Sequence, residues 1–289
     1  MNLKDYGIVE GDGIYILKDR DISAFFPQRE RNTHKGSYGT ACVVAGSERY
    51  LGAPFLAVSS ALRSGCGYVY AVVPEIIKSA LVAAYPQSIC CETPFLKANA
   101  IAVGMGMDCT QATYDTVKDL ILNYEGKLII DADGLNALAK FGKDILKSAK
   151  SKILLTPHVG EMARLAGISA DEVLSDAVGV AKSFATEYNV CVHLKNAVSV
   201  TCDGSGVVVC TRGNSALAKA GSGDILSGLI CGNAARGLSL KDAAASSQYV
   251  LGFTAEICAE QYGEYSLTAK EITDNLYIAI KRLTQTRFK

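Results

Sequence analysis

The 289-residue sequence has no tryptophan and only three histidines, His34, His158 and His193. It contains neither an HExxH motif nor a CxxC pair, so it gives no indication of a zinc enzyme or a structural zinc site. No stretch approaches the ~18 apolar residues that a membrane span needs. The first residues also lack the apolar core of a signal peptide. We therefore expect a cytoplasmic protein that does not enter the membrane.

The sequence also has no excess of positive or negative charge. Lysine plus arginine and aspartate plus glutamate number 29 each, and the formal net charge is zero. No basic field for nucleic acid is present, so small molecules are the expected partners. The ten cysteines are scattered, several of them inside apolar strand-like runs, which favours reduced, buried thiols over a disulfide framework.

Short apolar runs alternate with helical patterns along the chain, which is typical of a mostly parallel sheet covered on both faces. Strands are expected at Thr40–Ala45, Tyr68–Val73, Ala98–Val103, Lys127–Ile130, Ile153–Leu155 and Val190–Leu194. An edge hairpin is expected from Val198–Cys202 and Val207–Cys210, joined by Asp203-Gly204. Helices are expected at Ala53–Ser64, Glu75–Ala84, Gln111–Asn123, Gly160–Leu165, Asp171–Glu187, Asp224–Ala235, Lys241–Tyr262 and Ala269–Leu283. We interpret residues 1–289 as one domain, with residues 1–35 a polar, irregular extension anchored on the body by Phe25-Phe26-Pro27.

The stretch GNSALAKAGSGDILSGLICG, residues 213–232, carries the clearest chemical signal. It narrows to Gly221-Ser222-Gly223-Asp224 and runs directly into a helical apolar pattern. The first N–H groups of such a helix have no intrahelical partner and attract an anion, and the glycines leave room for a phosphate. Asp224 is suited to accept a proton from a hydroxyl that attacks this phosphate. The simpler interpretation is that Asp224 only caps the helix.

Polar side chains follow the expected strands, where ligands bind in sheets of this kind. Asp131 and Asp133 come directly after a buried strand and either form a turn with a helix cap or handle Mg²⁺ or phosphate. His158 follows Pro157 at another strand exit and is structural or functional. Glu161 either caps the next helix or holds a metal through water.

The segment Lys195-Asn196-Ala197 lies between a strand and the hairpin. Asn196 tolerates the left-handed conformation that a tight turn would need there, and Lys195 is either solvated or faces a nucleotide phosphate. His193, inside the strand, is expected to be a core or edge histidine. No complete GxGxxG fingerprint or GxxxxGK[ST] loop is present, so neither a dinucleotide-binding Rossmann site nor a P-loop is indicated.

Several spaced motifs together carry a family resemblance. They are HKGSYG (34–39), GAPFLA (52–57), DADGLNAL (131–138), TPHVGE (156–161), LKN (194–196) and GNSALAKAGSGD (213–224). In this order they resemble the ADP/ATP-dependent NAD(P)H-hydrate dehydratases, from about residue 20 to the end. The resemblance implies a ribokinase-like three-layer α/β/α fold with a mostly parallel central sheet and an antiparallel edge hairpin.

The resemblance also implies a repair reaction, in which the S-form of C6-hydrated NADH or NADPH is returned to the parent cofactor. ADP or ATP supplies a phosphoryl group to the C6 hydroxyl, Mg²⁺ assists, and phosphate then leaves. Asp224 would be the base, and Ala53, Gly106, His158 and Asp224 would contact the hydrated cofactor. The nucleotide-binding residues would be Lys195, Asn196, Ala197, Val198, Ser199, Gly221, Ser222 and Gly223. Glu161, Asp131 and Asp133 would be the metal ligands.

The sequence departs from the usual family pattern in three places: Val159 replaces a proline, Asn196 replaces a glycine, and GMGMD stands where GPGLG is typical. These changes imply a less constrained His158, a slightly strained turn at Asn196 and a weaker assignment of Gly106. The family tends to form tetramers, and many relatives carry an epimerase domain before this one. Only about 35 residues precede the first expected strand, so an epimerase would be a separate chain.

Taken without the resemblance, the residues are also consistent with two other functions. The same Gly-Ser-Gly-Asp turn suits a ribokinase-like kinase of a hydroxymethyl vitamin precursor, which would phosphorylate without elimination. A non-catalytic nucleotide sensor would keep the fold but would not need the carboxylate of Asp224. The sequence does not distinguish ADP from ATP, or the hydrate of NADH from that of NADPH.

Overall fold

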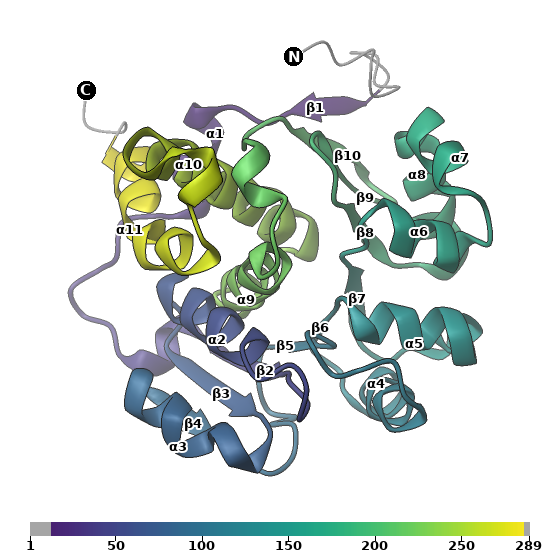
Figure 1. Ribbon diagram of the computed structural model, residues 1–289, viewed down its shortest axis with the longest axis horizontal. Helices are drawn as coiled ribbons and strands as arrows, with labels where there is room; N and C mark the ends of the chain where they lie inside the picture. Colours follow the sequence, from purple (N-terminus) through teal and green to yellow (C-terminus); the bar gives the residue numbers. More distant parts are fainter. Residues whose placement is uncertain (1–12, 286–289) are drawn as a thin grey trace.

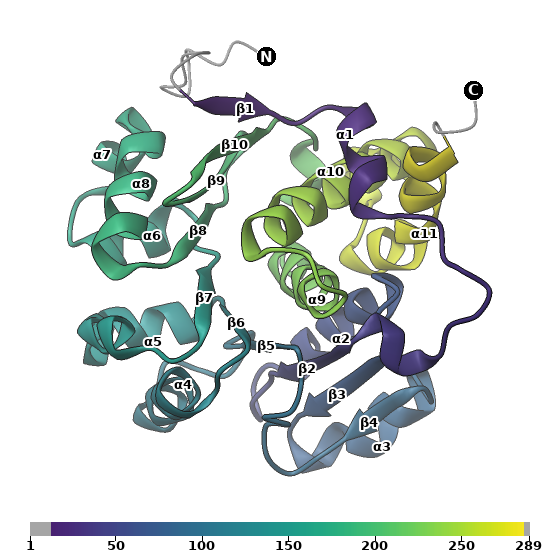
Figure 2. The same ribbon diagram turned by 180° about the vertical axis from the view of Figure 1, so that it is seen from behind.

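One ten-stranded sheet runs through the protein, and helices cover both of its faces (Figures 1 and 2). The computed structural model describes residues 13–285. The strand order is β1-β10-β9-β8-β7-β6-β5-β2-β3-β4. The strands are β1 (Ile14–Ile16), β2 (Thr40–Val44), β3 (Tyr68–Val72), β4 (Ser88–Cys90), β5 (Ala100–Val103), β6 (Lys127–Ile130), β7 (Lys152–Leu155), β8 (Cys191–Leu194), β9 (Ser199–Asp203) and β10 (Gly206–Cys210). Strand β9 is antiparallel to both neighbours and every other pairing is parallel, which confirms the predicted α/β class.

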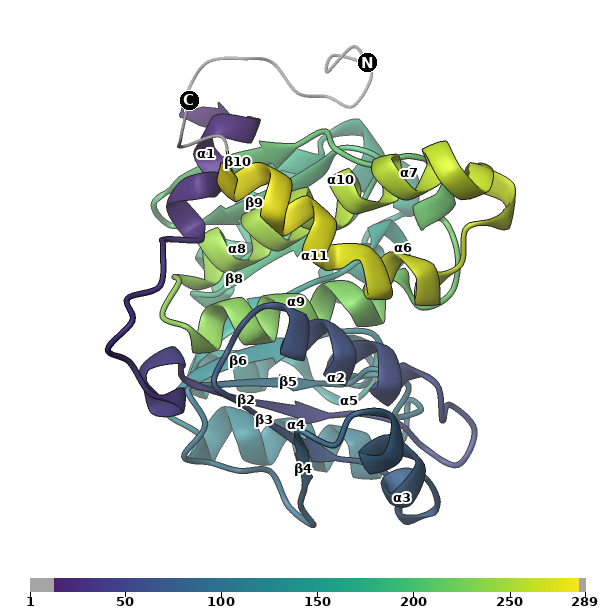
Figure 3. The ribbon, with the colours of Figure 1, turned by 90° about the vertical axis from the view of Figure 1, so that its left-hand side faces the viewer.

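The helices form two layers with separate apolar cores. One layer holds α1 (Asp19–Phe25), α2 (Ala53–Arg63), α3 (Glu75–Ala84), α9 (Ser222–Ala235), α10 (Leu240–Ser266) and α11 (Ala269–Gln285). The other holds α4 (Gln111–Asn123), α5 (Asp133–Phe141), α6 (Val159–Ala166), α7 (Ala170–Ser175) and α8 (Ala177–Tyr188). Short 3₁₀ turns are η2 (Lys35–Tyr38), η3 (Lys143–Ser148) and η4 (Ser215–Leu217). Figure 3 views the first layer from its outer side.

Strand residues divide between the cores with the period of two that a strand imposes. In β2, Ala41 and Val43 face the α9 layer, whereas Cys42 and Val44 face the α4–α8 layer. Helix α9 is apolar around most of its circumference and almost wholly buried, as expected of a helix packed on several sides. Gly228 makes its crossing with α2 possible, because a Cβ there would lie 2.0 Å from the carbonyl oxygen of Ala57.

The N-terminal region corrects one prediction. Residues 1–35 were expected to be irregular, but β1 and α1 are regular elements, and β1 pairs with β10 so that the hairpin is not the outermost edge. A three-residue strand and a seven-residue helix are too short to show a period in the sequence. Residues 1–12 lie outside the described part. The predicted anchor is present at Phe26, which is buried in the core.

Other predicted elements are correct in kind but differ at their ends or are divided. The helix expected over 171–187 is two helices, because Asp176 adopts φ −145° and its side chain accepts a hydrogen bond from the N–H of Gly179, which begins α8. The hairpin turn lies at Gly204-Ser205, one residue later than predicted. Strand β4 was not predicted, and helix α5 was predicted only as a helix that the turn at Asp131 and Asp133 could cap, without limits.

The ten cysteines are all free, and six of them are buried. His193 lies wholly in the core, where its Nδ1 is 2.7 Å from Oγ1 of Thr201. Its burial, together with the charge of Lys195, lowers its pKa to about 4, so it is a neutral core histidine as predicted. Among residues 13–285 no helix has both the length and the apolar character of a membrane span.

Candidate active site

The start of α9 forms the glycine turn at which the sequence predicts an anion-binding site. Gly221 adopts φ +98°, and a Cβ at this position would lie 2.6 Å from Cδ1 of Leu56, so only glycine suits the turn. Ser222 is buried, and its hydroxyl has no hydrogen-bond partner within the described chain. A buried polar group without a partner is costly, and a bound phosphate would supply the missing partner here.

Asp224 lies in the first turn of α9 and is partly buried. Burial, together with the negative charge of Asp131 and a smaller contribution from Asp133, raises the pKa of Asp224 to about 7, and Lys195 opposes the rise. A carboxyl group whose pKa lies near neutrality exchanges a proton readily at physiological pH. The structure therefore gives Asp224 the acid–base property expected of a general base.

Asp131 follows β6 and is 1% exposed. One carboxylate oxygen accepts a hydrogen bond from Nζ of Lys195 at 2.7 Å, and the other accepts one from the hydroxyl of Ser227 at 2.7 Å. Burial alone would raise the pKa of Asp131, but the charge and hydrogen bond of Lys195 outweigh it and hold the pKa low. Ala132 has φ +49°, which is strained for a residue with a Cβ, as is common near functional sites.

Ser227 is a site residue that the sequence analysis did not single out. It lies three residues after Asp224, so both side chains are on the same face of α9. Its hydrogen bond ties the base-bearing helix to the carboxylate that holds Lys195. A serine inside an apolar helical run is the only sequence signal for this contact, and it does not identify the partner.

Lys195 joins the anion-binding turn to the exits of β6 and β7. Its Nζ lies 4.0 Å from Oε2 of Glu161, and a Cβ at Gly223 would lie 3.5 Å from the same nitrogen. Burial alone would lower the pKa of Lys195, but Asp131 and Glu161 together raise it, so the side chain stays charged. This ammonium group faces the glycine turn, where it can neutralise a phosphate.

His158 and Glu161 cap α6. The imidazole Nδ1 of His158 accepts hydrogen bonds from the N–H groups of Gly160 and Glu161, and Oε2 of Glu161 accepts one from the N–H of His158 at 2.8 Å. The ring is half exposed, and burial together with the charges of Lys195 and Arg164 lowers its pKa. His158 is therefore a neutral side chain fixed at the edge of the site. Its main chain lies beside that of Lys195.

Gly106 and Ala53 lie against each other. Gly106 has φ +63°, and a Cβ added there would lie 3.1 Å from Cβ of Ala53 and 2.7 Å from Cβ of Tyr50. Ala53 begins α2, whose Leu56 touches Gly221. The two residues predicted on the cofactor side are therefore brought together next to the anion-binding turn, and Tyr50 is a half-exposed neighbour that the sequence did not indicate.

The segment after Lys195 corrects the expectation for Asn196. The described non-glycine residues with positive φ are Asp108, Ala132 and Asn189. Asn196 is not among them, so the turn does not need the left-handed conformation. Its side-chain oxygen instead accepts a hydrogen bond from the N–H of Ala197, and the next residues, Val198 and Ser199, are buried as β9 begins.

The three candidate metal ligands, Asp131, Asp133 and Glu161, each make contacts with different partners. One carboxylate oxygen of Asp133 accepts a hydrogen bond from the N–H of Asp108, whereas Asp131 is paired with Lys195 and Ser227. Burial is the main cause that raises the pKa of Glu161, and Lys195, 4.0 Å away, opposes the rise. In the described part of the chain, no group of three histidine, cysteine, aspartate or glutamate residues could hold a metal alone. The donors suit a Mg²⁺ ion that is carried largely by phosphate oxygens.

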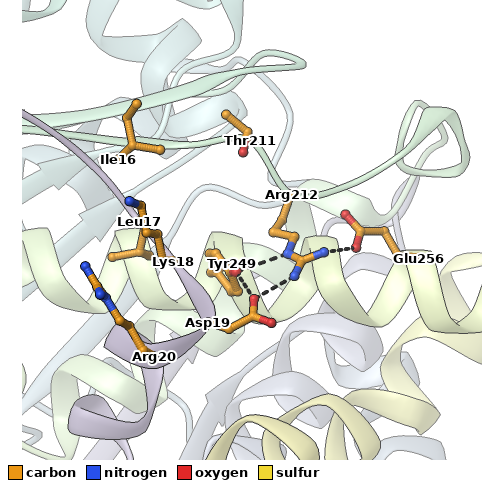
Figure 4. A pocket seen from close by; sticks show the side chains of 9 residues that line it. All are labelled: Ile16, Leu17, Lys18, Asp19, Arg20, Thr211, Arg212, Tyr249 and Glu256. Carbon is orange, nitrogen blue, oxygen red and sulfur yellow. Dashed lines mark hydrogen bonds and ion pairs between the residues drawn. The ribbon is translucent and has the colours of Figure 1, made fainter. Parts of the chain in front are cut away.

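A cavity of about 600 Å³ lies at the ends of β1 and β10, and Figure 4 shows the side chains that line it. Arg212 donates hydrogen bonds to Asp19, Tyr249 and Glu256 there. The other carboxylate oxygen of Glu256 accepts a hydrogen bond from the N–H of Gly213, at 2.8 Å. This network fixes the start of the GNSALAKAGSGD loop. It joins α1, α10 and the loop, so its partners are far apart in the sequence.

The fold and the glycine turn define a ribokinase-like α/β protein. A solved ribokinase-like superfamily protein of Enterococcus faecalis V583 superposes with a TM-score of 0.84, covering 96% of this chain and 99% of that one, at 19% identity, which shows the fold. The crystal structure of an ADP/ATP-dependent NAD(P)H-hydrate dehydratase from Bacillus subtilis, co-crystallised with ATP/Mg²⁺, superposes with a TM-score of 0.83 at 30% identity. That match covers 93% of this chain and 98% of the other.

Sequence comparisons define the family more narrowly. A family model described as NAD(P)H-hydrate dehydratase matches residues 41–277. The Bacillus subtilis ADP-dependent (S)-NAD(P)H-hydrate dehydratase is 31% identical over 274 residues, covering 91% of this chain and 97% of that protein. The chain belongs to the NAD(P)H-hydrate dehydratase family.

A second kind of relative is about twice as long. The bifunctional NAD(P)H-hydrate repair enzyme of Moorella thermoacetica is 34% identical over 278 residues, covering 90% of this chain and 52% of that enzyme. The chain thus spans about half the length of such relatives.

Proposed function

We propose that the protein dehydrates the S-form of C6-hydrated NADH or NADPH, using ADP or ATP as phosphoryl donor. The observation that carries this proposal is the placement of Asp224, with a pKa of about 7, in the same helix turn as an anion-binding glycine segment that faces Lys195. The name and nucleotide of the Bacillus subtilis relative support the choice of reaction.

The proposed chemistry proceeds in two steps. Asp224 removes the proton of the C6 hydroxyl, whose oxygen forms a bond to the terminal phosphorus of ADP or ATP, while the bond from that phosphorus to the nucleotide breaks and AMP or ADP leaves. The nitrogen lone pair of the ring then expels phosphate from C6 and restores the double bond as a ring proton is lost. Phosphate is a much better leaving group than hydroxide, which is why a nucleotide is required.

The residues around Asp224 have distinct roles in this proposal. The N–H groups of Gly221, Ser222, Gly223 and Asp224 hold the transferring phosphoryl group, and Lys195 neutralises its charge. Asp131 and Ser227 position Lys195, since both oxygens of Asp131 are already bonded. We therefore assign Mg²⁺, which shields phosphate charge when bound, to the nucleotide phosphates and Glu161.

The two substrates enter from different sides of the turn. The hydrated cofactor lies against Ala53, Gly106 and His158, and the adenine nucleotide lies along the segment 195–199 and Gly223. The contacts of Gly106 with Ala53 and of Lys195 with Asp131 support this division, because the first pair joins the turn through Leu56 at Gly221 and the second pair approaches it at Gly223.

The direct test is incubation of the full chain with hydrated NADH, ADP and Mg²⁺. We expect the near-ultraviolet absorbance of the dihydronicotinamide to return, with one AMP and one phosphate formed per cofactor. A phosphorylated vitamin precursor, formed from a hydroxymethyl thiazole or pyridoxine without phosphate release, would instead show a kinase. Nucleotide binding without either reaction would show a sensor.

The rate should depend on pH through Asp224. Its raised pKa of about 7 means that the protonated, inactive form is abundant in mildly acidic solution. We expect kcat/KM to rise about tenfold for each pH unit below 7 and to level off above it, because kcat/KM reports the ionisation of the free enzyme. Steady-state rates at limiting substrate concentrations across the neutral range measure this. A flat profile would contradict the assignment of Asp224 as the base.

His158 should affect the hydrated cofactor more than the nucleotide. His158→Ala is expected to raise KM for the hydrate about tenfold, as loss of one or two contacts would, and to leave KM for ADP within about twofold. Because the side chain also caps α6, the alanine variant should lose about 1 kcal/mol of stability. His158→Asn is the matched control, since asparagine keeps the cap but lacks the ring. Equal changes in both KM values would reject this placement.

The family resemblance further predicts a homotetramer in the cytoplasm. These expectations stay predictions. Light scattering of the purified full chain would give the subunit number directly.

A further inference from the structure

We infer that the protein has a second anion site, which takes the phosphate group of a small molecule at the end of α9 opposite the candidate active site. The site is a cavity of about 690 Å³ lined by Arg29, Arg63 and Arg236. Arg236 ends α9, twelve residues after Asp224, so about 18 Å of helix separates the two sites.

Arg236 provides the main reason to expect an anion. Its guanidinium is partly buried, and its Nε is a buried donor without a hydrogen-bond partner in the described chain. One Nη donates to the carbonyl of Phe25 at 3.2 Å and to Oδ1 of Asn233 at 2.8 Å. Neither acceptor carries a charge. Burial, and then repulsion by Arg29, lowers the pKa of Arg236, and no carboxylate opposes this change.

The other two arginines also lack an acidic partner. Within residues 13–285, none of Arg29, Arg63 and Arg236 forms an ion pair with a carboxylate. Arg29 donates to the carbonyl of Gly65 and lies over the ring of Tyr38. The guanidinium of Arg63 lies 5.8 Å from the ring centre of Tyr277. The two side chains are therefore held near the cavity by neutral groups, which leaves their charges uncompensated.

The C-terminal ends of the neighbouring helices explain only part of this clustering of arginines. Helices α2 and α9 both end beside the cavity, and their C-terminal carbonyls favour a nearby cation. One or two arginines would satisfy these carbonyls, whereas three repel one another, and the carbonyls leave Nε of Arg236 unbonded. A phosphate group resolves both problems, because it carries two charges and accepts several hydrogen bonds from guanidinium groups.

The cavity wall indicates what accompanies the phosphate. Phe26, Pro27 and Ile280 supply apolar surface, and Gln28 and Gln285 supply amide groups. The guanidinium of Arg236 lies 4.8 Å from the ring centre of Phe26, so charged and apolar surfaces are adjacent. This combination fits a phosphate ester with an apolar or planar body as well as free phosphate. The site uses none of the residues assigned to the reaction.

Titration calorimetry with inorganic phosphate and, separately, with AMP tests the inference. In the wild-type full chain we expect saturable binding that Arg29→Ala/Arg63→Ala weakens at least about tenfold, because each arginine contributes charge-assisted hydrogen bonds. Arg282→Ala in the wild type is the matched control, since this exposed arginine on α11 does not line the cavity, and it should change binding less than about twofold. If the binding that Arg29→Ala/Arg63→Ala removes is tighter for AMP than for phosphate, the apolar wall contributes, whereas equal binding would indicate free phosphate.

The same titrations in the Lys195→Ala variant distinguish binding at this cavity from binding at the candidate active site. Lys195→Ala removes a cation of the candidate active site. Phosphate binding that survives in this variant, and that disappears when Arg29→Ala/Arg63→Ala is added, belongs to the cavity that the three arginines line. Thermal unfolding checks that each variant is folded, and Arg236→Lys tests the buried position while keeping its charge. Loss of all binding in Lys195→Ala would overturn the inference. So would equal weakening by Arg282→Ala and by the double variant, or an absence of saturable phosphate binding in the wild type.

Discussion

Asp224→Asn is expected to lower kcat by about three orders of magnitude, the middle of the range for loss of a general base, while ADP binding stays within a few fold. The amide has nearly the same shape as the carboxylate but cannot accept the proton of the attacking hydroxyl. Single-turnover rates with hydrated NADH and ADP measure the effect, and calorimetry with ADP measures the binding. Near-normal turnover would show that another group is the base.

The same substitution should make the protein more stable above neutral pH. The folded-state pKa of Asp224 is raised to about 7, so folding favours the protonated form. Its contribution to stability is full below the ordinary carboxyl pKa and is lost as pH rises through 7. Removing the charge should therefore add about 1–2 kcal/mol at alkaline pH, a value reduced for partial exposure. Asp171→Asn, at the exposed first turn of α7, is the matched control and should change neither property.

An inactive but stabilised Asp224→Asn protein would separate a role in chemistry from a role in folding. The structure does not support the simpler interpretation of Asp224 as a plain helix cap, because the N-cap of α9 is Gly221 and no side chain makes a capping hydrogen bond there. Asparagine caps a helix about as well as aspartate, so a capping role alone would leave both stability and turnover nearly unchanged in this variant.

The sequence predicts the fold through its periodic segments. Helices such as α3 and α4 were predicted at their observed limits, because each has a full apolar face and clear boundaries. Short elements were not predictable: β1 has three residues and is stable because it pairs with β10, almost 200 positions later. Such pairings depend on tertiary contacts, which local patterns do not contain.

The candidate site was predictable where backbone geometry demands a residue type. Gly221 and Gly106 have positive φ, and His158 caps a helix directly after a proline. These local backbone requirements can be recognised from the neighbouring residues in the sequence. Ser227 and Arg212 carry no such signal, since their roles arise from Asp131 and Glu256, which lie far away in the sequence. The ion pair of Asp131 was not predictable for the same reason, because its partner Lys195 is distant in the sequence. The sequence predicted Asp131 as a possible metal ligand instead.

Asp131→Ala is expected to cause the largest loss of stability, about 3–5 kcal/mol, because it leaves the buried ammonium of Lys195 without its main partner. The exposed fractions of the two side chains are 1% for Asp131 and 19% for Lys195, and their atoms are 2.7 Å apart. Ser227 would also lose its acceptor. Urea unfolding at neutral pH gives the free energy directly.

The double variant Asp131→Ala/Lys195→Met distinguishes an ion pair from simple packing. Replacing both charges removes the unpaired ammonium, so it should recover more than half of the lost stability, whereas independent contributions would add. Turnover should not recover, because Lys195 is needed for the phosphate. Recovery of activity along with stability would show that the pair serves folding alone. Failure of the double variant to recover stability would show that Asp131 acts mainly through Ser227 and the turn at Ala132.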